Sequence, residues 1–524
     1  MELIWILGDQ LLPEHPLLPA PDPSRVVALI ESAPRARRLR YHQQKLTLLF
    51  AAMRHHGAAL ERAGHRVLYH RLEDPLPAAP ADRGTSVADA SDSAAVLAAW
   101  VGLHGVKAIH LLEPNDFHTQ AALPALAAEL RVPIHAHPSP QFLLSRPNFL
   151  AWAKGRRSVV MEQHYRRMRK ELGVLMASDG QPVGGVWNTD ADNRQTRAQF
   201  RKARPVVPRV SEPEPDPVVR VVAEQVSRLF PDHPGRAADL WLPVTRAGAL
   251  AWLERFVAER LAGFGPWEDL MVDQEPVLFH SVLSPLLNIG LLTPMECVQA
   301  AEAAWAEGRA PLASVEGFIR QIVGWREFIH GMYWRHMPDY LAVNALDAHR
   351  PLPRWAYSGE TDMRCLSRAI GDAIRLGYNH HIQRLMVLGN YFLLGGYAPQ
   401  EVLRWYLEMY SDAYDWVMVP NVLGMVLYAD GGWFATKPYS AGPTYLDRMG
   451  DHCAHCRYNP KVKTGPEACP FQALYWAFHS RHADRFRGHP RMAMMVRQVD
   501  RMEDGLRSTY TRQAEQFLDA QGLP

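Results

Sequence analysis

The sequence predicts a two-part protein, in which an N-terminal α/β domain with a parallel sheet is followed by a large all-α domain. The first observation is that short apolar runs alternate with amphipathic stretches over residues 1–140. The second is that strand-like alternation disappears beyond residue 218, where apolar residues recur at helical spacing. The third is the composition of the 524 residues, 48% hydrophobic and 21% charged, which is typical of a globular protein with a large core.

The N-terminal elements follow from the apolar pattern. Runs at residues 3–7, 26–30, 67–69, 108–112 and 134–136 predict strands, and amphipathic segments at residues 45–63, 93–103 and 120–130 predict helices. Near-continuous apolar strands separated by helices indicate a parallel, Rossmann-like sheet, whose ligands bind beyond the carboxyl ends of the strands. Gly8, Asp9 and Gln10 follow the first strand and Glu31 follows the second, so they are expected at that edge. The absence of G-x-G-x-x-G and Walker A motifs argues against an ordinary dinucleotide or ATP site.

Residues 141–217 are predicted to be an interdomain linker. They are basic and mixed in character as far as residue 204, and five prolines then fall within residues 205–217, which predicts an extended connector. Residues 218–524 form the predicted helical domain, with amphipathic stretches at residues 249–261, 315–330, 382–394 and 399–410.

Charge and hydropathy exclude several classes of protein. The formal net charge is +2, from 57 Lys+Arg against 55 Asp+Glu, which argues against a wholly basic nucleic-acid binder but allows a local basic face. No run of 18 apolar residues occurs, and residues 1–5 lack a basic n-region and a cleavage site. We therefore expect a cytoplasmic protein without a membrane span, and we expect it to be a monomer.

The cysteines suggest a metal centre. Cys453 and Cys456 form a C-x2-C pair, Cys469 follows after twelve residues, and Cys365 lies far upstream. Four such thiolates could hold one iron–sulfur cluster. Zinc suits the same spacing, with His452 or His455 in place of Cys365, and a set of buried free thiols is the third interpretation. Cys297 is interpreted as a core thiol.

Two basic runs could neutralise DNA phosphates, although most such runs are solvated faces. The runs comprise Lys154, Arg156, Arg157, Arg166, Arg167, Arg169 and Lys170, and then Arg481, Arg485, Arg487, Arg491, Arg497 and Arg501.

Several motifs of the helical domain carry a resemblance to a known family. They lie at residues 280–291, 322–328, 380–386, 412–424, 430–432 and 436–439, and residues 8–11 and 183–188 match as well. Together with Cys365, Cys453, Cys456 and Cys469, they resemble the iron–sulfur bacterial cryptochrome/photolyase family, the prokaryotic (6-4) photolyases. The resemblance spans essentially the whole chain.

The resemblance implies an antenna domain, a helical FAD-binding domain and a [4Fe–4S] cluster in place of zinc, in a bacterial cytoplasmic protein. It also implies 6,7-dimethyl-8-ribityllumazine as the antenna chromophore. The implied activity is blue-light-driven repair of (6-4) pyrimidine–pyrimidone photoproducts in UV-damaged DNA. An electron comes from photoexcited reduced FAD and a histidine assists proton transfer, after the damaged dinucleotide has flipped out of the duplex.

The resemblance also assigns residues to roles, although each has an ordinary structural interpretation as well. The expected catalytic residues are His380 as the lesion-facing acid, His381, Tyr439 as a hydrogen-bond donor and Asp269 as an orienting group. The expected FAD contacts are His280, Ser281, Ser284, Gln321, Arg326, Arg384, Asp412, Asp415 and Asn421. The expected antenna contacts are Gly8, Asp9, Gln10, Glu31 and Tyr41, and the expected electron relay is Trp405, Tyr406 and Tyr357.

Two positions depart from the family pattern. Tyr357 stands where a second relay tryptophan is expected, and Met418 stands where a carboxylate near the lesion is common. These departures leave open a cryptochrome-like blue-light photoreceptor with the same cofactors and little repair. Without the resemblance, a helical iron–sulfur module that binds nucleic acid, such as a primase-like domain, would fit the cysteines.

Overall fold

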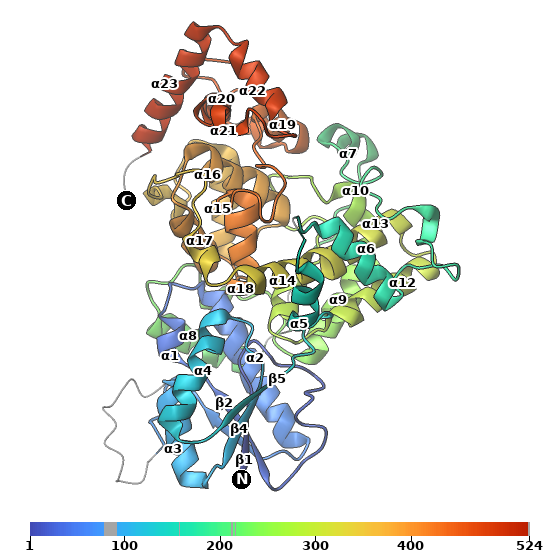
Figure 1. The fold of residues 1–524 in the computed structure, drawn as a ribbon, viewed down its shortest axis with the longest axis vertical. Coiled ribbons are helices and arrows are strands. Elements are labelled where there is room, and N and C mark those ends of the chain that lie inside the picture. The colour runs from blue at the N-terminus through green and yellow to red at the C-terminus, as the bar shows by residue number, and fades with distance from the viewer. Residues whose placement is uncertain (78–91, 157, 211–212, 215, 522–524) are drawn as a thin grey trace.

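The structure is a computed structural model that describes residues 1–77, 92–156, 158–210, 213–214 and 216–521. Arg157 of the first basic run and Pro215 of the proline-rich stretch lie outside the described residues. A sheet domain occupies one end of the molecule, the main helical domain the middle, and α19 to α23 the opposite end (Figure 1).

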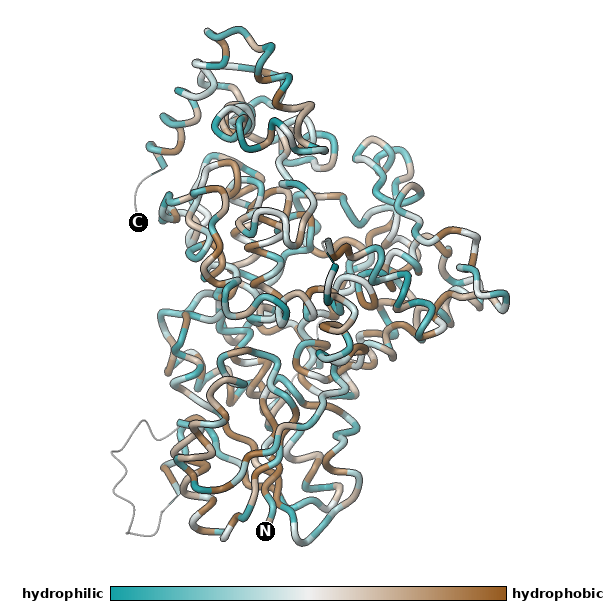
Figure 2. Tube along the Cα trace, in the orientation of Figure 1, coloured by the Kyte–Doolittle hydropathy of each residue, from teal (hydrophilic) through white to brown (hydrophobic). Residues whose placement is uncertain are grey.

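The predicted parallel sheet is confirmed. Within the described residues it has five strands, all paired in parallel, in the order β3-β2-β1-β4-β5. The strands are β1 (Glu2–Trp5), β2 (Arg25–Ile30), β3 (Val67–His70), β4 (Ala108–Leu112) and β5 (Ile134–His137). Their apolar character is visible as brown segments in the sheet domain (Figure 2).

Alternate residues of each strand pack into different cores because successive side chains point to opposite faces. Leu3 and Val26 join α3 (Ser93–His104) and α4 (Phe117–Leu130) on one face. Val27 and Leu29 join the large core that continues through α2 (Gln43–Arg62) into the helical domain. The sheet is therefore covered on both faces, as its continuous apolar strands predict.

The predicted helices are present, and capping residues decide where some of them start. Asp116 accepts a hydrogen bond from the Thr119 N–H at 2.8 Å, so α4 begins earlier than its apolar pattern indicates. The helices of the C-terminal part are α8 (Pro217–Leu229), α9 (Arg246–Glu259), α10 (Leu261–Trp267), α11 (Ser284–Asn288), α12 (Pro294–Ala306), α13 (Leu312–Ile319), α14 (Glu327–His336), α15 (Arg364–Leu376), α16 (Asn390–Gly395), α17 (Pro399–Met409), α18 (Asp415–Met418), α19 (Pro443–Met449), α20 (Pro470–Arg481), α21 (Ala483–Phe486), α22 (Ala493–Asp500) and α23 (Asp504–Ala520).

The segment predicted as a linker is folded over much of its length. It contains α5 (Arg146–Ala153), α6 (Met161–Leu172) and α7 (Arg197–Ala203), which pack against α14, a π-helical stretch at Arg320–Arg326, and α19. Tyr165 and Met168 of α6 are fully buried in this packing. The sequence did not predict this helix because the many arginines of α6 obscure the helical spacing of its few apolar residues.

Arg169, from the first basic run, is a structural residue. Its buried guanidinium donates hydrogen bonds to the carbonyls of Val174, Leu175 and Trp187. It satisfies backbone acceptors where α6 ends, so it is not available to a DNA phosphate. None of the helices in the part of the chain that the structure describes has the length and apolar character needed to cross a membrane.

Candidate active site

Stretches of π-helix run through the segments that carry the motifs of the helical domain. They are η3 (Arg320–Arg326), η6 (Gln383–Gly389) and η7 (Val419–Val426). A π-helical turn displaces side chains from regular helical spacing and is frequent at functional sites. Arg326, Arg384 and Asn421 lie in these stretches, and η6 packs against η7.

A histidine cluster lies just before η6. The rings of His280 and His380 stack with their centroids 4.5 Å apart and their planes within 5°. Among the described residues, both ring nitrogens of His380 and Nε2 of His280 lack a hydrogen-bond partner, although all three atoms are buried. Burial, and then neighbouring histidines, lowers the pKa of His280 to about 3 and that of His380 well below its ordinary value. Both rings are therefore neutral, with nitrogens left for a ligand.

His381 lies on the accessible side of this cluster. Its ring is exposed, yet the surrounding protein, followed by the positive charges of Arg384 and Arg194, lowers its pKa to about 4. The ring is thus open to solvent and close to two cations, and we call the surroundings of His280, His380 and His381 the recess.

Carboxylates held by Arg194 stand near this recess. Arg194 Nε lies 3.2 Å from Glu268 Oε1 and 3.8 Å from Asp269 Oδ2, and Nη2 lies 3.3 Å from Asp190. Burial raises the pKa of Glu268 to about 7 and raises that of Asp269, while Arg194 opposes both shifts. Sequence reasoning missed Arg194 because it lies in the segment predicted as a linker, with no spacing that pairs it with Glu268.

Tyr439 lies near the same charges. Burial raises the pKa of its phenol, and the positive charges of Arg491 and Arg194 oppose that shift. Arg491 donates to Thr436 Oγ1 at 2.6 Å, so one member of the C-terminal basic run lies beside the Tyr439 motif.

Other members of the C-terminal run have structural partners. Arg481 donates to the carbonyl of Leu394 at 3.2 Å, and Arg487 pairs with Asp500 at 2.7 Å. The run is therefore not a uniform DNA-facing stripe.

Asp412 organises the expected flavin contacts. It accepts hydrogen bonds from Ser284 Oγ at 2.6 Å and from Arg384 Nη1 and Nη2 at 2.9 and 3.2 Å. The guanidinium of Arg384 also lies 4.0 Å from the Tyr410 ring centroid. These hydrogen bonds connect α11, η6 and the segment that precedes α18.

Three other residues expected to contact the flavin form hydrogen bonds that involve backbone carbonyls. Asn421 Nδ2 donates to the Val417 carbonyl at 2.8 Å, and Gln321 Nε2 to the Gly317 carbonyl at 3.0 Å. The carbonyl of Ser281 accepts from the Trp252 indole at 3.1 Å.

Two other residues expected at the flavin, Asp415 and Arg326, have charged partners within the protein. The Asp415 carboxylate forms two hydrogen bonds with Arg38 of the sheet domain, at 3.0 and 3.1 Å. Arg326 is buried, pairs with Glu327 at 2.9 Å and donates to the Gln141 carbonyl at 3.1 Å. Arg38 and Gln141, which come from distant parts of the chain, thus contribute to holding Asp415 and Arg326.

A second site lies between the domains. A cavity of about 140 Å³ is lined by Gly8, Asp9, Tyr41 and Lys45 on the sheet side, and by Ala413, Tyr414, Asp415 and Trp416 on the helical side. The Trp416 N–H and the Tyr414 hydroxyl are buried without a partner among the described residues. Such unpaired groups suit a polar ligand in the cavity.

Lys45 lines this cavity together with two other cations, Arg35 and Arg38, and sequence reasoning missed it. Its ammonium donates to the Ala413 carbonyl and lies 4.3 and 4.7 Å from the ring centroids of Tyr41 and Tyr414. Burial lowers the pKa of Lys45 to about 7. A lysine in an amphipathic helix ordinarily predicts a solvated side chain, so no local signal identified it.

Glu31 and Gln10 do not line this cavity. The Glu31 carboxylate pairs with Arg54 at 2.8 and 2.9 Å, and accepts from the Tyr69 hydroxyl at 2.8 Å and the Leu72 N–H at 3.0 Å. Its acceptor capacity is filled by protein donors, which leaves the Glu31 carboxylate little capacity for the antenna contact expected from the sequence. Gln10 is fully buried and donates to the Glu113 carbonyl at 2.8 Å.

The cysteines of the predicted centre come together. Cys365 lies in the first turn of α15, Cys453 lies in η8 (His452–His455), Cys456 follows η8, and Cys469 precedes α20. Burial, and then the charges of Cys469, Cys453 and Cys456, raises the pKa of Cys365, so the four thiols share one neighbourhood. Yet no three His, Cys, Asp or Glu side chains within the described ranges are placed to hold a metal ion.

His452 is directed toward another partner. Its Nε2 lies 3.9 Å from Asp273, which also pairs with Arg364 and Arg368. Cys297 is fully buried, and burial raises its pKa to about 12, as expected for a core thiol.

Two of the expected relay residues, Trp405 and Tyr406, lie on α17. Trp405 and Tyr406 are buried, with ring centroids 5.2 Å apart. The Trp405 N–H donates to the Ala356 carbonyl at 2.7 Å, and the Tyr406 hydroxyl to the Arg384 carbonyl at 2.6 Å.

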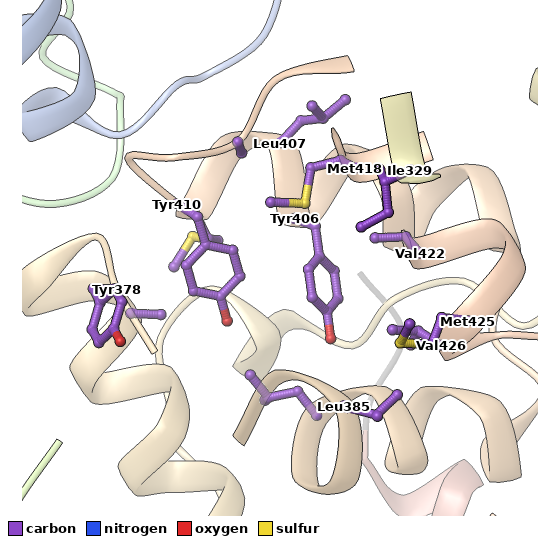
Figure 3. Close-up of a cluster of buried hydrophobic side chains, with 14 of the residues drawn as sticks. Ile329, Tyr378, Leu385, Tyr406, Leu407, Tyr410, Met418, Val422, Met425 and Val426 are labelled. Carbon is purple, nitrogen blue, oxygen red and sulfur yellow. The ribbon is translucent and has the colours of Figure 1, made fainter. Parts of the chain in front are cut away.

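Met418 lies in the hydrophobic cluster around Tyr406, with Ile329 and Val422 (Figure 3). Its thioether fills apolar space there.

Comparisons with known proteins agree with this architecture. Residues 4–241 match the family model described as deoxyribodipyrimidine photo-lyase-related protein. A crystal structure of a bacterial class III photolyase from Agrobacterium tumefaciens is similar with a TM-score of 0.53 and 17% identity, over 84% of this chain and 81% of that chain. A Synechocystis sp. PCC6803 cryptochrome is similar with a TM-score of 0.53 and 13% identity, over 97% of this chain and 93% of that one.

The sheet domain, the helical domain and these structural likenesses define the fold as that of photolyases and cryptochromes. A protein of Agrobacterium fabrum (strain C58 / ATCC 33970) named (6-4) photolyase is 40% identical over 520 residues, 99% of each chain. The chain belongs to the (6-4) photolyase family.

Proposed function

We propose that the protein is a DNA photolyase that uses blue light to reverse (6-4) photoproducts. The observation that carries the proposal is the stacked pair of His280 and His380, whose buried nitrogens have no partner among the described residues. It occurs in a chain that is 40% identical along its length to a (6-4) photolyase.

The family implies FAD, and the residues present fit it. The fit rests on the unpaired nitrogens of His280 and His380 and on the Arg384–Asp412 pair beside Ser284. Ser281, Ser284, Gln321, Arg384, Asp412 and Asn421 would hold FAD. When bound and reduced, FAD supplies the electron that light transfers to the lesion.

His380 donates the proton in this proposal, and His381 shares the recess. His380 is neutral in the ligand-free protein because burial lowers its pKa. A negatively charged ligand in the recess favours its protonated form, which makes it an acid only when substrate is bound. Asp269 and Arg194 position the histidines, and the Tyr439 hydroxyl donates a hydrogen bond to the lesion.

The DNA partner would supply a flipped dinucleotide, at an unstacking cost of a few kcal/mol. Arg491 beside Thr436 would contact a phosphate near the recess. Arg166 and Lys170 are exposed, and both lie in residues 141–217, as Arg194 does. Their charged groups lie 5.6 and 5.2 Å from the Trp187 ring centroid. We expect the protein to act as a cytoplasmic monomer.

For the cysteines we propose a [4Fe–4S] cluster. Thiolates around one zinc ion stand about 3.8 Å apart, as tetrahedral Zn–S bonds require. A cluster of several iron atoms spaces its thiolates further apart. Cys365, Cys453, Cys456 and Cys469 share a neighbourhood, and the resemblance of the chain's motifs to the iron–sulfur photolyase family supports the cluster.

The interdomain cavity would hold the antenna, which we propose to be 6,7-dimethyl-8-ribityllumazine. Its fit rests on the unpaired Trp416 N–H and Tyr414 hydroxyl and on the Lys45 ammonium. Gly8, Asp9 and Tyr41, three of the expected antenna contacts, line the cavity, and a planar polar chromophore suits the rings of Tyr41 and Tyr414.

The test is a repair assay with purified, reduced protein. A (6-4)-containing oligonucleotide and a cyclobutane-dimer oligonucleotide are incubated separately, in blue light and in darkness. We expect light-dependent recovery of the (6-4) substrate alone, and its loss in His380→Ala. His349→Ala is the control, because His349 is exposed and pairs only locally with Asp347. If reduced wild-type protein binds the lesion but recovers none of it, the photoreceptor becomes the better assignment.

A further inference from the structure

Tyr357 is bound to a buried carboxylate. Its hydroxyl donates a hydrogen bond to Glu408 Oε2 at 2.9 Å. Glu408 is only 4% exposed, while Tyr357 is half-buried. Arg40 of the sheet domain lies 4.7 Å from the Tyr357 ring centroid and 3.6 Å from Glu408 Oε2. The phenol thus touches a fixed proton acceptor and is still within reach of solvent.

This pair adjoins Trp405. Trp405 and Glu408 lie three residues apart on α17, so they share one helix face. The Trp405 N–H donates to the carbonyl of Ala356, the residue before Tyr357. The short helix η5 (Arg354–Ala356) is therefore fastened to the same face of α17 that carries Glu408.

The physical difficulty of a tyrosine in an electron relay is its proton. A neutral phenol loses an electron readily only if its proton can leave at the same time, because the oxidised phenol is a strong acid. In the resting protein, burial and the negative charge of Glu408 raise the pKa of Tyr357, so the phenol keeps its proton. The hydrogen bond supplies the acceptor needed at the moment of oxidation.

We propose that Tyr357 is the terminal electron donor of the relay and that Glu408 accepts its proton. This rests on the proposed flavin function. Trp405 loses one electron to the photoexcited oxidised flavin. Tyr357 then gives one electron to oxidised Trp405, its O–H bond breaks, and the proton passes to Glu408 Oε2. Trp405 returns to its neutral form, Tyr357 becomes a neutral radical, and Glu408 becomes a carboxylic acid.

The cycle closes at the surface. A thiol in solution gives a hydrogen atom to the Tyr357 oxygen and becomes a thiyl radical, and Glu408 releases its proton to solvent. Arg40 acts as a positioning residue, since its backbone N–H lies 3.4 Å from Glu408 Oε1 and its guanidinium lies 3.6 Å from Glu408 Oε2.

The test follows the radical in FAD-loaded, oxidised protein, by transient absorption and electron paramagnetic resonance after a light pulse. In wild type we expect a tyrosyl radical that forms at least twofold more slowly in D2O than in H2O. Y357F should leave a long-lived tryptophanyl radical. E408Q keeps the size and the backbone contact but loses the basic carboxylate, and should slow tyrosyl formation at least tenfold. Y357W should give a radical on tryptophan without a solvent isotope effect.

W355F is the matched control. Trp355 lies two residues from Tyr357, but its ring packs against Tyr391, with centroids 5.2 Å apart, and its indole N–H has no hydrogen-bond partner among the described residues. We expect wild-type kinetics from it. A tyrosyl signal that survives in Y357F, or an unchanged rate and isotope effect in E408Q with an unchanged melting temperature, would overturn the proposal. Repair by chemically reduced wild-type protein is measured separately, so a failed repair assignment is distinguished from a failed relay.

Discussion

The imidazole of His280 stacks on that of His380 with the ring centroids 4.5 Å apart. Because neither nitrogen of His380 has a partner among the described residues, the stack fixes the ring without using its proton-transfer atoms. His380→Asn should reduce light-driven repair about 10²- to 10⁴-fold, the usual contribution of a positioned acid. Lesion affinity should change only slightly. Single-turnover repair and a separate binding titration check this, and repair within threefold of wild type would contradict it.

Arg194 should matter although it lies outside the resembling motifs. Arg194→Gln removes the cation from Glu268 and Asp269, so the pKa values of both acids rise further. We expect about a tenfold loss of lesion affinity or repair, the scale of one lost charged hydrogen bond. Arg309→Gln is the control, because that residue forms an exposed pair with Glu307. Equal behaviour of the two variants would argue against a role at the recess.

Removal of a cluster thiolate should release iron. Cys365→Ala is expected to lower iron and sulfide content and the melting temperature together, since a structural metal centre stabilises the fold that binds it. Cys297→Ala is the internal control: it should cost stability through a small cavity yet keep the iron. Stoichiometric zinc in wild-type protein would reject the cluster.

Lys45 should govern antenna occupancy. Lys45→Met keeps the apolar stem but removes the ammonium between Tyr41 and Tyr414. Chromophore retained at the cavity should fall at least tenfold, with FAD content unchanged, as absorption spectra and extraction would show. Lys107→Met, at an exposed position, should retain wild-type spectra. Full retention in Lys45→Met would contradict this role.

Stability should fall in acid partly through His164. Its ring is fully buried among Phe149, Trp152 and Phe328, and burial lowers its pKa to about 3. A lowered histidine pKa means that the unfolded chain binds the extra proton, so stability is lost as pH falls below about 6.5. From pH 7 to pH 5 this group alone should cost about 2 kcal/mol.

His164→Phe should therefore flatten the dependence of unfolding free energy on pH. Denaturant unfolding at the two pH values measures it, with His349→Phe as the exposed control. An identical slope in wild type and His164→Phe would show that another group is responsible.

Much of the site could be found in the sequence, because its residues cluster in short motifs. His380, Asp412 and Tyr439 were identified from such segments, and the histidine stack and the Asp412 contacts lie there. Arg194 and Lys45 could not be found this way. Their partners, Glu268 and Ala413, are distant in the chain, and no local period marks an arginine or lysine as buried.

The sequence by itself determined the strands, most helices and the order of the two domains, because these depend on apolar periods of a few residues. Tertiary structure decided which polar side chains meet. Glu31 is hydrogen-bonded to Arg54 and Tyr69, while Lys45 of α2 lines the cavity between the domains. It also folded residues of the expected linker onto the helical domain and brought Glu408 to Tyr357. Such pairings depend on which distant backbone brings an opposite charge or an unfilled acceptor within about 3 Å, and no local spacing encodes that distance.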